Sequence, residues 1–131
     1  MKNRRGQTLV ESTLVMIVFL GLLLGFIDAG QLLFTRQTLA DRVRTAARWA
    51  SVRPYDETAV RNMVLYNQPE ASDDKGFLGL SAGNVEIERL GQGTPNERIQ
   101  VAIVNYEYAF VSPWLGAHRS ARAAVETVPV E

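Results

Sequence analysis

The sequence predicts an α+β fold in which one long N-terminal helix leads into a small soluble domain with a short helix and a three-stranded antiparallel sheet. Three observations support this prediction. Residues 12–27 carry no charge and are mostly apolar. No proline occurs before Pro54 to interrupt a helix. Three strand signals follow residue 84, and two of them alternate apolar and polar side chains, as strands with one buried face do.

The composition fits one small domain joined to a membrane segment. The chain has 131 residues, 47% of them apolar, and the apolar residues are concentrated in the first third. Residues 53–131 are enough for a modest hydrophobic core. The absence of cysteine excludes disulfides, thiolate zinc sites and cysteine nucleophiles.

The first apolar segment has the length of a single membrane span. Leu9 to Ile27 would cover about 28 Å as a helix, close to the ~30 Å hydrocarbon core of a bilayer. A secretory signal peptide would have a shorter apolar core and small residues before the cut. Here a cut after Gly30 would place Asp28 at the third position before it, where a small neutral residue is expected. We therefore interpret residues 9–27 as a transmembrane segment.

A carboxylate lies inside the start of this apolar segment and needs an explanation. Two arginines precede Gly6, and Glu11 follows five residues after that glycine. A carboxylate costs about 2.5–3.5 kcal/mol at the centre of a bilayer and less near its edge. Glu11 either extends its carboxylate to the headgroups of a plain membrane anchor or pairs with a charge on a neighbouring chain.

The helix is expected to continue beyond the membrane as an amphipathic segment over residues 31–52. The apolar stripe recurs at spacings of 7, 4, 3 and 4 residues and consists of Leu32, Leu39, Val43, Ala46 and Ala50. Together, residues 8–52 would form one helix of about 45 residues, nearly 68 Å long. Its first half would lie in lipid and its second half against the soluble domain.

Two features of the span suggest contacts between helices. Gly21 and Gly25 form a G-x-x-x-G motif, which allows two helix backbones to approach closely in lipid, although glycine is also common in membrane helices. Asp28 directly follows the span. It is either a solvated residue at the outer interface or a pairing partner for a neighbour's Arg36.

The soluble part, residues 53–131, begins where Pro54 breaks the long helix. Asp56 is expected to cap a short helix that ends at Asn67 and Pro69. A loop follows over residues 70–83. The predicted strands cover residues 85–90, 99–108 and 120–128, with a turn at 91–96 and a loop through 112–116.

The short connections between these strands favour an antiparallel meander, with one face on the amphipathic half of the long helix. An aromatic group is present near the end of the second strand: Tyr106, Tyr108, Phe110 and Trp114. We interpret it as core and sheet packing rather than as a binding surface.

The sequence carries no catalytic motif, and we expect neither an enzyme nor a bound cofactor or metal. His118 is the only histidine, and no nucleophile elbow accompanies Ser112 or Ser120. No phosphate-binding or dinucleotide-binding glycine motif is present. We interpret His118 as a surface or loop residue.

The N-terminal pattern resembles type IV pilin-like proteins and, more closely, the TadE family of pseudopilins or minor pilins of the tight-adherence (Flp) pilus machinery. The resemblance covers roughly residues 4–52 and is carried by Arg5-Gly6-Gln7, Leu9-Val10-Glu11, the apolar run, Gly25-Phe26-Ile27-Asp28-Ala29-Gly30, Arg36-Gln37 and Ala46-Ala47-Arg48-Trp49-Ala50. Ser12 departs from the pattern, because a phenylalanine commonly follows the glutamate in the family.

The resemblance implies a pilin-like fold and a processed precursor. Residues 1–6 would be a leader, and a prepilin peptidase would cut between Gly6 and Gln7, which makes Glu11 the fifth residue of the mature chain. Residues 7–52 would then be the long helix. Removal of the leader leaves 11 basic against 14 acidic residues, and a mildly acidic chain does not favour nucleic-acid binding.

The resemblance also implies a location and partners. The protein would cross the inner (cytoplasmic) membrane once, with its C-terminal domain periplasmic or extracellular, and either enter the pilus or prime its assembly. Its partners would be the prepilin peptidase, the major Flp pilin, a TadF-like pseudopilin, the inner-membrane assembly platform and the lipid bilayer. Basic residues occur on both sides of the span, so charge alone does not orient it. The alternative is an unprocessed single-pass anchor that displays a binding domain.

Overall fold

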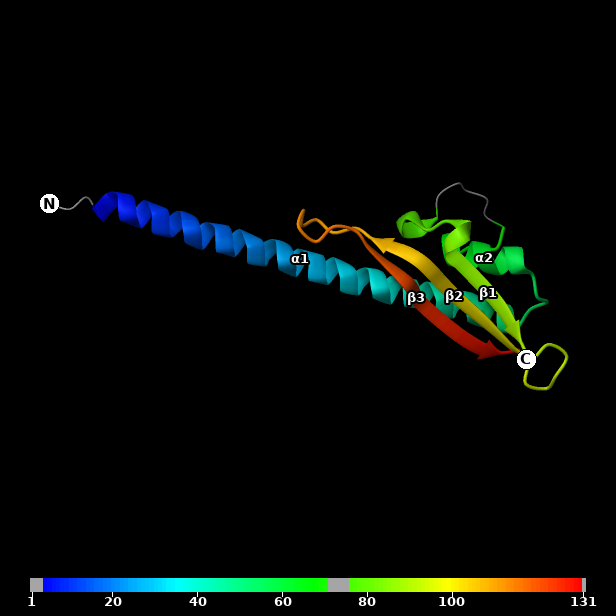
Figure 1. Cartoon of the computed structure of the whole chain (residues 1–131). Coiled ribbons are helices and arrows are strands. Elements are labelled where there is room, and N and C mark those ends of the chain that lie inside the picture. Colours follow the sequence, from blue (N-terminus) through cyan, green and yellow to red (C-terminus); the bar gives the residue numbers. More distant parts are fainter. Residues whose placement is uncertain (1–3, 71–75, 131) are drawn as a thin grey trace.

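A computed structural model describes residues 4–70 and 76–130. It shows a long helix with a small domain attached to its C-terminal half (Figure 1). The helices are α1 (Arg4–Ser51) and α2 (Glu57–Tyr66), and the strands are β1 (Val85–Leu90), β2 (Arg98–Tyr108) and β3 (His118–Pro129). Two short 3-10 turns, Phe77–Gly79 and Ala82–Asn84, precede β1. The predicted α+β arrangement is confirmed.

Helix α1 is one continuous element of 48 residues, about 72 Å long. It begins at Arg4, three residues earlier than the predicted start at residue 7, and ends at Ser51. The helix therefore runs through Gly6 and through both glycines of the G-x-x-x-G motif. Residues 1–3 of the expected leader lie outside the described residues.

The sheet is the predicted antiparallel meander, in the order β1-β2-β3. Strand β1 has the predicted bounds, β2 begins one residue earlier than predicted, and β3 extends the predicted strand at both ends. The register between β2 and β3 shifts after Ile103, and Asn105 has a positive φ of 52°. The Asn84 side-chain amide donates to the Val104 and Asn105 carbonyl oxygens, at 3.1 and 3.2 Å, and so supports this irregular point.

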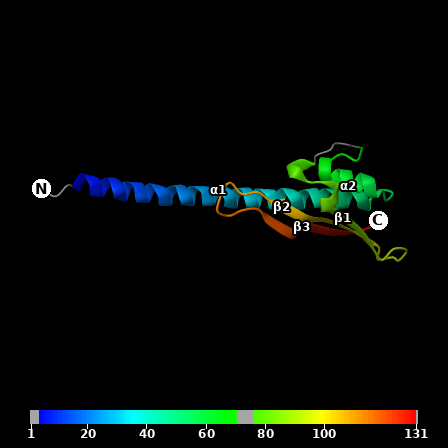
Figure 2. The same cartoon turned by 45° about the horizontal axis from the view of Figure 1, so that its top comes forward.

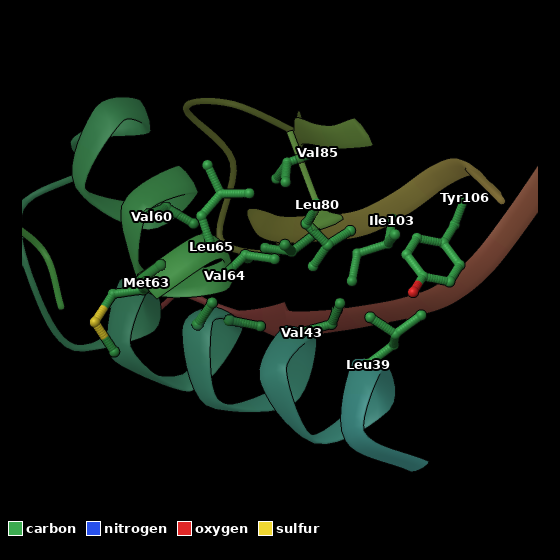
Figure 3. Close-up of a cluster of buried hydrophobic side chains, with 14 of the residues drawn as sticks. Leu39, Val43, Val60, Met63, Val64, Leu65, Leu80, Val85, Ile103 and Tyr106 are labelled. Carbon is green, nitrogen blue, oxygen red and sulfur yellow. The ribbon is translucent and has the colours of Figure 1, made fainter. Parts of the chain in front are cut away.

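The hydrophobic core lies between one face of the sheet and the C-terminal half of α1, with α2 closing one side (Figure 3). Four residues of the predicted α1 stripe are at most 1% exposed: Leu39, Val43, Ala46 and Ala50. The fifth, Leu32, packs against the edge of the core. The opposing side chains of β2 are Ile99, Val101 and Ile103, all at most 1% exposed. The predicted packing of the sheet on the amphipathic half of the long helix is confirmed.

Helix α2 is held by the caps that the sequence predicts. The Asp56 carboxylate accepts hydrogen bonds from the backbone N–H groups of Thr58 and Ala59, at 2.9 and 3.3 Å. At the other end, Asn67 adopts the left-handed conformation with φ 60° and donates its backbone N–H to the Met63 carbonyl. These caps satisfy backbone groups that the helix itself leaves without partners.

The aromatic group near the end of β2 divides into two parts. Tyr106 and Tyr108 are buried, with ring centroids 4.9 Å apart in an edge-to-face arrangement. The Tyr106 hydroxyl donates to the Leu78 carbonyl at 3.0 Å, and burial raises the pKa of Tyr106 above its usual value. Trp114, by contrast, is 62% exposed. Phe110 is partly buried and packs against the core. The interpretation of the group as core packing is therefore right for the two tyrosines and Phe110 and wrong for Trp114.

Candidate membrane-spanning and assembly segment

The N-terminal half of α1 extends away from the domain (Figures 1 and 2). Its apolar side chains are exposed on all sides of the helix. Each of the following is between 44% and 75% exposed: Leu9, Val10, Leu14, Val15, Met16, Ile17, Val18, Phe19, Leu20, Leu22, Leu23, Phe26 and Ile27. A soluble monomer seldom exposes more than a few hundred Å² of continuous apolar surface. This half of the helix is therefore suited to an apolar surrounding that the chain itself does not provide.

Within residues 4–70 and 76–130, α1 is the one helix that is long and apolar enough to cross a membrane. None of the side chains in its most apolar stretch is buried by the rest of the chain. A helix that was apolar because it formed the centre of a soluble core would be covered. The segment is thus compatible with a single-pass membrane anchor.

The hydroxyl groups near the start of the segment are satisfied within the helix. Ser12 donates its hydroxyl to the Thr8 carbonyl at 2.9 Å, and Thr13 donates to the Leu9 carbonyl at 2.8 Å. An unpaired polar group in hydrocarbon costs several kcal/mol, so such internal bonds are needed there. The two hydroxyl residues therefore do not oppose burial of this turn in lipid or against another helix.

Glu11 differs from these hydroxyl residues because it is exposed and has no internal partner. Among the described residues, no side-chain hydrogen bond or ion pair involves its carboxylate. It lies one helical turn after Gln7, about 6 Å along the axis. The structure leaves its carboxylate available to a group outside the chain.

Gly21 and Gly25 present an open helix surface. A Cβ atom built on either glycine would meet no atom within 4 Å. Because residues four apart lie on the same side of a helix, the two glycines form one shallow face. A second helix could approach the backbone there, but nothing within this chain does so.

Asp28 occupies a position that the sequence did not predict. Its side chain is buried, with only 2% of the residue exposed. One carboxylate oxygen accepts the Val111 backbone N–H at 2.7 Å, and the other accepts the Ser112 backbone N–H at 3.0 Å. The interpretation of Asp28 as a solvated interface residue is therefore wrong. It holds the loop between β2 and β3 against α1.

Arg36, the expected pairing partner of a neighbour's Asp28, also has a contact within the chain. Its guanidinium carbon lies 5.9 Å from the centroid of the Tyr108 ring, at a distance where a cation and an aromatic face attract. Both members of the expected pair are thus engaged inside one chain. A contact of Asp28 with a neighbouring subunit stays a prediction.

The other candidate residues do not form a binding or catalytic site. His118 begins β3 and is exposed, as expected for a surface histidine. In the part of the chain that the structure describes, no three side chains among His, Asp and Glu come together in a group that could hold a metal ion. Asp73 and Asp74 are an acidic pair in the predicted loop over residues 70–83, but the sequence around them lacks the spacing of a calcium-binding loop. Both lie outside the described part of the chain.

Comparison with known proteins confirms the family resemblance for α1. The TadE family model, described as a TadE-like protein, matches residues 6–48. This range contains the exposed apolar half, Glu11 and most of the packed half of the helix. A search of curated proteins and a search of solved structures returned no match. The match and the long apolar helix together fit a membrane-anchored protein related to the Tad pilus.

Proposed function

We propose that this protein is a TadE-like minor pilin or pseudopilin, a structural and non-enzymatic component of Flp pilus assembly. The observation that supports this proposal best is the position of Glu11. It is a carboxylate without an internal partner, inside an exposed apolar helix that matches the TadE-like family. A plain anchor needs the apolar helix but has no use for this carboxylate.

The first step is cleavage of the leader by a prepilin peptidase, which hydrolyses the peptide bond between Gly6 and Gln7. This bond lies in the first turn of α1. The first backbone N–H groups of a helix have no intrahelical partners, so the turn opens at little cost in hydrogen bonds. Hydrolysis leaves a new ammonium group on Gln7 of the mature chain.

The second step is pairing between subunits. The Gln7 ammonium and the Glu11 carboxylate of one chain lie about one turn apart, and each can meet the opposite charge on a neighbouring helix. A charge pair removed from water is stable only when both partners are present, and loss of one costs about 3–5 kcal/mol. Pairing therefore selects a defined register between neighbouring apolar helices.

The domain then lies on the outer side of the inner membrane and accompanies the helix into the assembly. The leader faces the cytoplasm, and residues 53–131 are periplasmic or extracellular. The partners are those of the Tad system: the major Flp pilin, a TadF-like pseudopilin, the prepilin peptidase and the inner-membrane platform. The chain's own contribution is packing, through its helix surface.

The experiment compares Glu11→Gln with Ser12→Ala in cells that assemble the pilus. Glu11→Gln keeps the size of the side chain but removes its charge, so we expect filament assembly to fall a hundredfold or more, from a loss of about 3 kcal/mol per contact. Ser12→Ala removes only a hydroxyl that bonds within its own helix and should assemble normally. Both variants should remain at wild-type levels in the membrane fraction.

Normal assembly of Glu11→Gln would contradict the proposal. If Glu11→Gln reaches the membrane and assembles as well as Ser12→Ala, pairing through this carboxylate is not needed. The unprocessed single-pass anchor that displays a binding domain is then the better account.

A further inference from the structure

The loop between β2 and β3, residues 109–117, is the part of the domain that lies closest to the exposed half of α1. In both Figure 1 and Figure 2 it extends from the sheet along α1 toward the N-terminus, beyond the ends of the strands. Three of its large apolar side chains are exposed, Val111 to 55%, Trp114 to 62% and Leu115 to 51%, whereas Phe110 packs against the core. Such exposure is unusual in a loop that is otherwise well tied to the fold.

Hydrogen bonds hold this loop in place. The two bonds from Val111 and Ser112 to the Asp28 carboxylate fix its base to α1. The Leu115 backbone N–H donates to the Ser112 carbonyl at 3.2 Å and closes a turn with Pro113 at its second position, where proline suits a β-turn. The exposed tryptophan is therefore displayed by a fixed turn.

The attachment point determines the level of the loop relative to the membrane span. Asp28 directly follows residues 9–27, so the loop lies where the span ends. Apolar residues of α1 that are 60–75% exposed lie at the same level, from position 26 to 34, over about 12 Å of helix axis. We call the combined set the apolar collar: Phe26, Leu33, Phe34, Val111, Trp114 and Leu115.

The distribution of charges around the collar favours contact with a lipid surface over contact with water. Residues 29–35 of α1 and residues 108–117 of the loop carry no charge. Charged groups return immediately beyond both segments, at Arg36 and in the exposed pair of Glu107 with Arg119, 3.3 Å apart. Asp28, the one charge at collar level, is covered by the loop. An uncharged level that continues the span and ends at charged groups matches the edge of a bilayer.

We propose that the loop of residues 109–117 is a second membrane contact, with Trp114 seated in the interface between the lipid tails and headgroups of the outer leaflet. Tryptophan is enriched at this depth because its ring is apolar and its indole N–H needs a polar partner. Contact at both the helix and the loop fixes the tilt of the domain on the membrane. Asp28 acts as a positioning residue, because its carboxylate holds the loop at that depth. The proposal rests on the membrane insertion of α1.

The test uses tryptophan fluorescence of the full chain in vesicles of phosphatidylcholine and phosphatidylglycerol. The chain has two tryptophans, so the Trp49→Phe variant reports on Trp114 alone. We expect blue-shifted emission, protection from aqueous acrylamide, and quenching by lipids brominated near the headgroup end of the tail. The matched control, Trp114→Phe, reports on Trp49, which lies about 31 Å beyond Asp28 along α1 and should not respond to brominated lipid.

A third variant separates failure of the loop contact from failure of the membrane insertion. Phe19→Trp in a chain lacking both natural tryptophans places the reporter inside the span. Quenching of this reporter by lipids brominated deep in the tail shows insertion. If it is quenched while Trp114 is open to acrylamide, the loop contact is overturned and the span stands. If neither is quenched, the span itself is wrong.

Two further results decide between lipid and protein as the occupant. Trp114 that is protected from acrylamide but insensitive to brominated lipid would be covered by protein, and the lipid contact would be overturned. With Asp28→Asn we expect loop docking to weaken roughly tenfold or more, since tenfold corresponds to about 1.4 kcal/mol, close to the lower end of the range for a lost hydrogen bond to a charged group. Trp114 should then become more accessible to acrylamide while Phe19→Trp is quenched as before. Unchanged accessibility would remove the role of Asp28.

Discussion

The two halves of α1 belong to one helix but are built for different surroundings. Residues 32–51 place a narrow apolar stripe against the sheet and α2, with Leu39 and Val43 completely buried. Residues 9–27 are apolar on every side, and the rest of the chain buries none of their side chains. The second half is stabilised by the folded domain, whereas the first half is suited to lipid or to other helices. Regular helical structure therefore says little about what holds each half in place.

The side chains explain the difference. In the packed half, charged residues cover the faces that the stripe leaves free: Arg36, Asp41, Arg44 and Arg48. This is the pattern of a helix with one side in water. The exposed half has Glu11 as its one charged residue between residues 9 and 27, so no side of it is suited to water. The boundary falls at Asp28, where the chain binds its own loop.

Shortening a side chain in each half should produce the largest contrast. Leu39→Ala leaves a cavity in the core and should lower the free energy of unfolding of the domain by about 2–5 kcal/mol. Leu14→Ala, at a 62% exposed position, should change it by about 0.5 kcal/mol or less. Urea denaturation of both variants in detergent micelles measures this. Equal destabilisation would mean that the exposed half has a partner inside the chain.

A charge should disturb the exposed half more than the packed half, which is the reverse of the order expected for shortened side chains. Val18→Arg puts a guanidinium near the middle of the span and should oppose membrane insertion by about 2.5–3.5 kcal/mol. Thr45→Arg, on the exposed side of the packed half, should insert normally. The fraction of each variant that stays in the membrane after alkaline extraction reports the effect. Full retention of Val18→Arg would argue against a span centred there.

Loss of the α2 cap should affect only the packed half. Asp56→Ala removes the acceptor for two backbone N–H groups and should cost about 1 kcal/mol of domain stability. Asp56→Asn keeps a capping oxygen and should be close to neutral. The thermal unfolding midpoint distinguishes the two variants. Reduced membrane retention of Asp56→Ala would show that the two halves are coupled after all.

The smallest effect concerns acid stability of the β1–β2 hairpin. A hydrogen bond from Arg89, followed by one from the Gly93 backbone, lowers the pKa of Glu97 below its usual value. A lowered folded-state pKa gives stability that is present above the unfolded pKa, roughly 4.3, and is lost as the pH falls below it. In Glu97→Gln this contribution is absent, so the free energy of unfolding should depend less on pH in this range. An unchanged curve between about pH 5 and pH 3 would assign the acid sensitivity to other carboxylates.

Local patterns in the sequence predicted most of the fold. The 3.6-residue spacing of Leu39, Val43, Ala46 and Ala50 identified the core face of α1, and Asp56 and Asn67 marked the ends of α2. These features depend on neighbours within a few turns. The contact of Asp28 with Val111 and Ser112 joins positions more than 80 residues apart and follows from the register of the whole sheet, so no local pattern indicated it. Trp114 was misassigned for the same reason.

The candidate membrane-spanning segment likewise has features that the local sequence predicts and features that it does not. The apolar helix over residues 9–27 could be predicted because length and hydrophobicity are properties of the segment itself. The early start of α1 at Arg4 could not, since helix ends depend on caps that this sequence does not mark clearly. The pairing role of Glu11 stays a prediction.

The central claim, that this chain enters the pilin pathway, is tested most directly by its intact mass and N-terminal sequence. The protein is isolated from membranes of cells with and without the prepilin peptidase. We predict a chain that begins at Gln7 when the peptidase is present and a chain that retains residues 1–6 when it is absent. A chain that retains those residues in both samples would contradict the claim and leave an unprocessed membrane anchor.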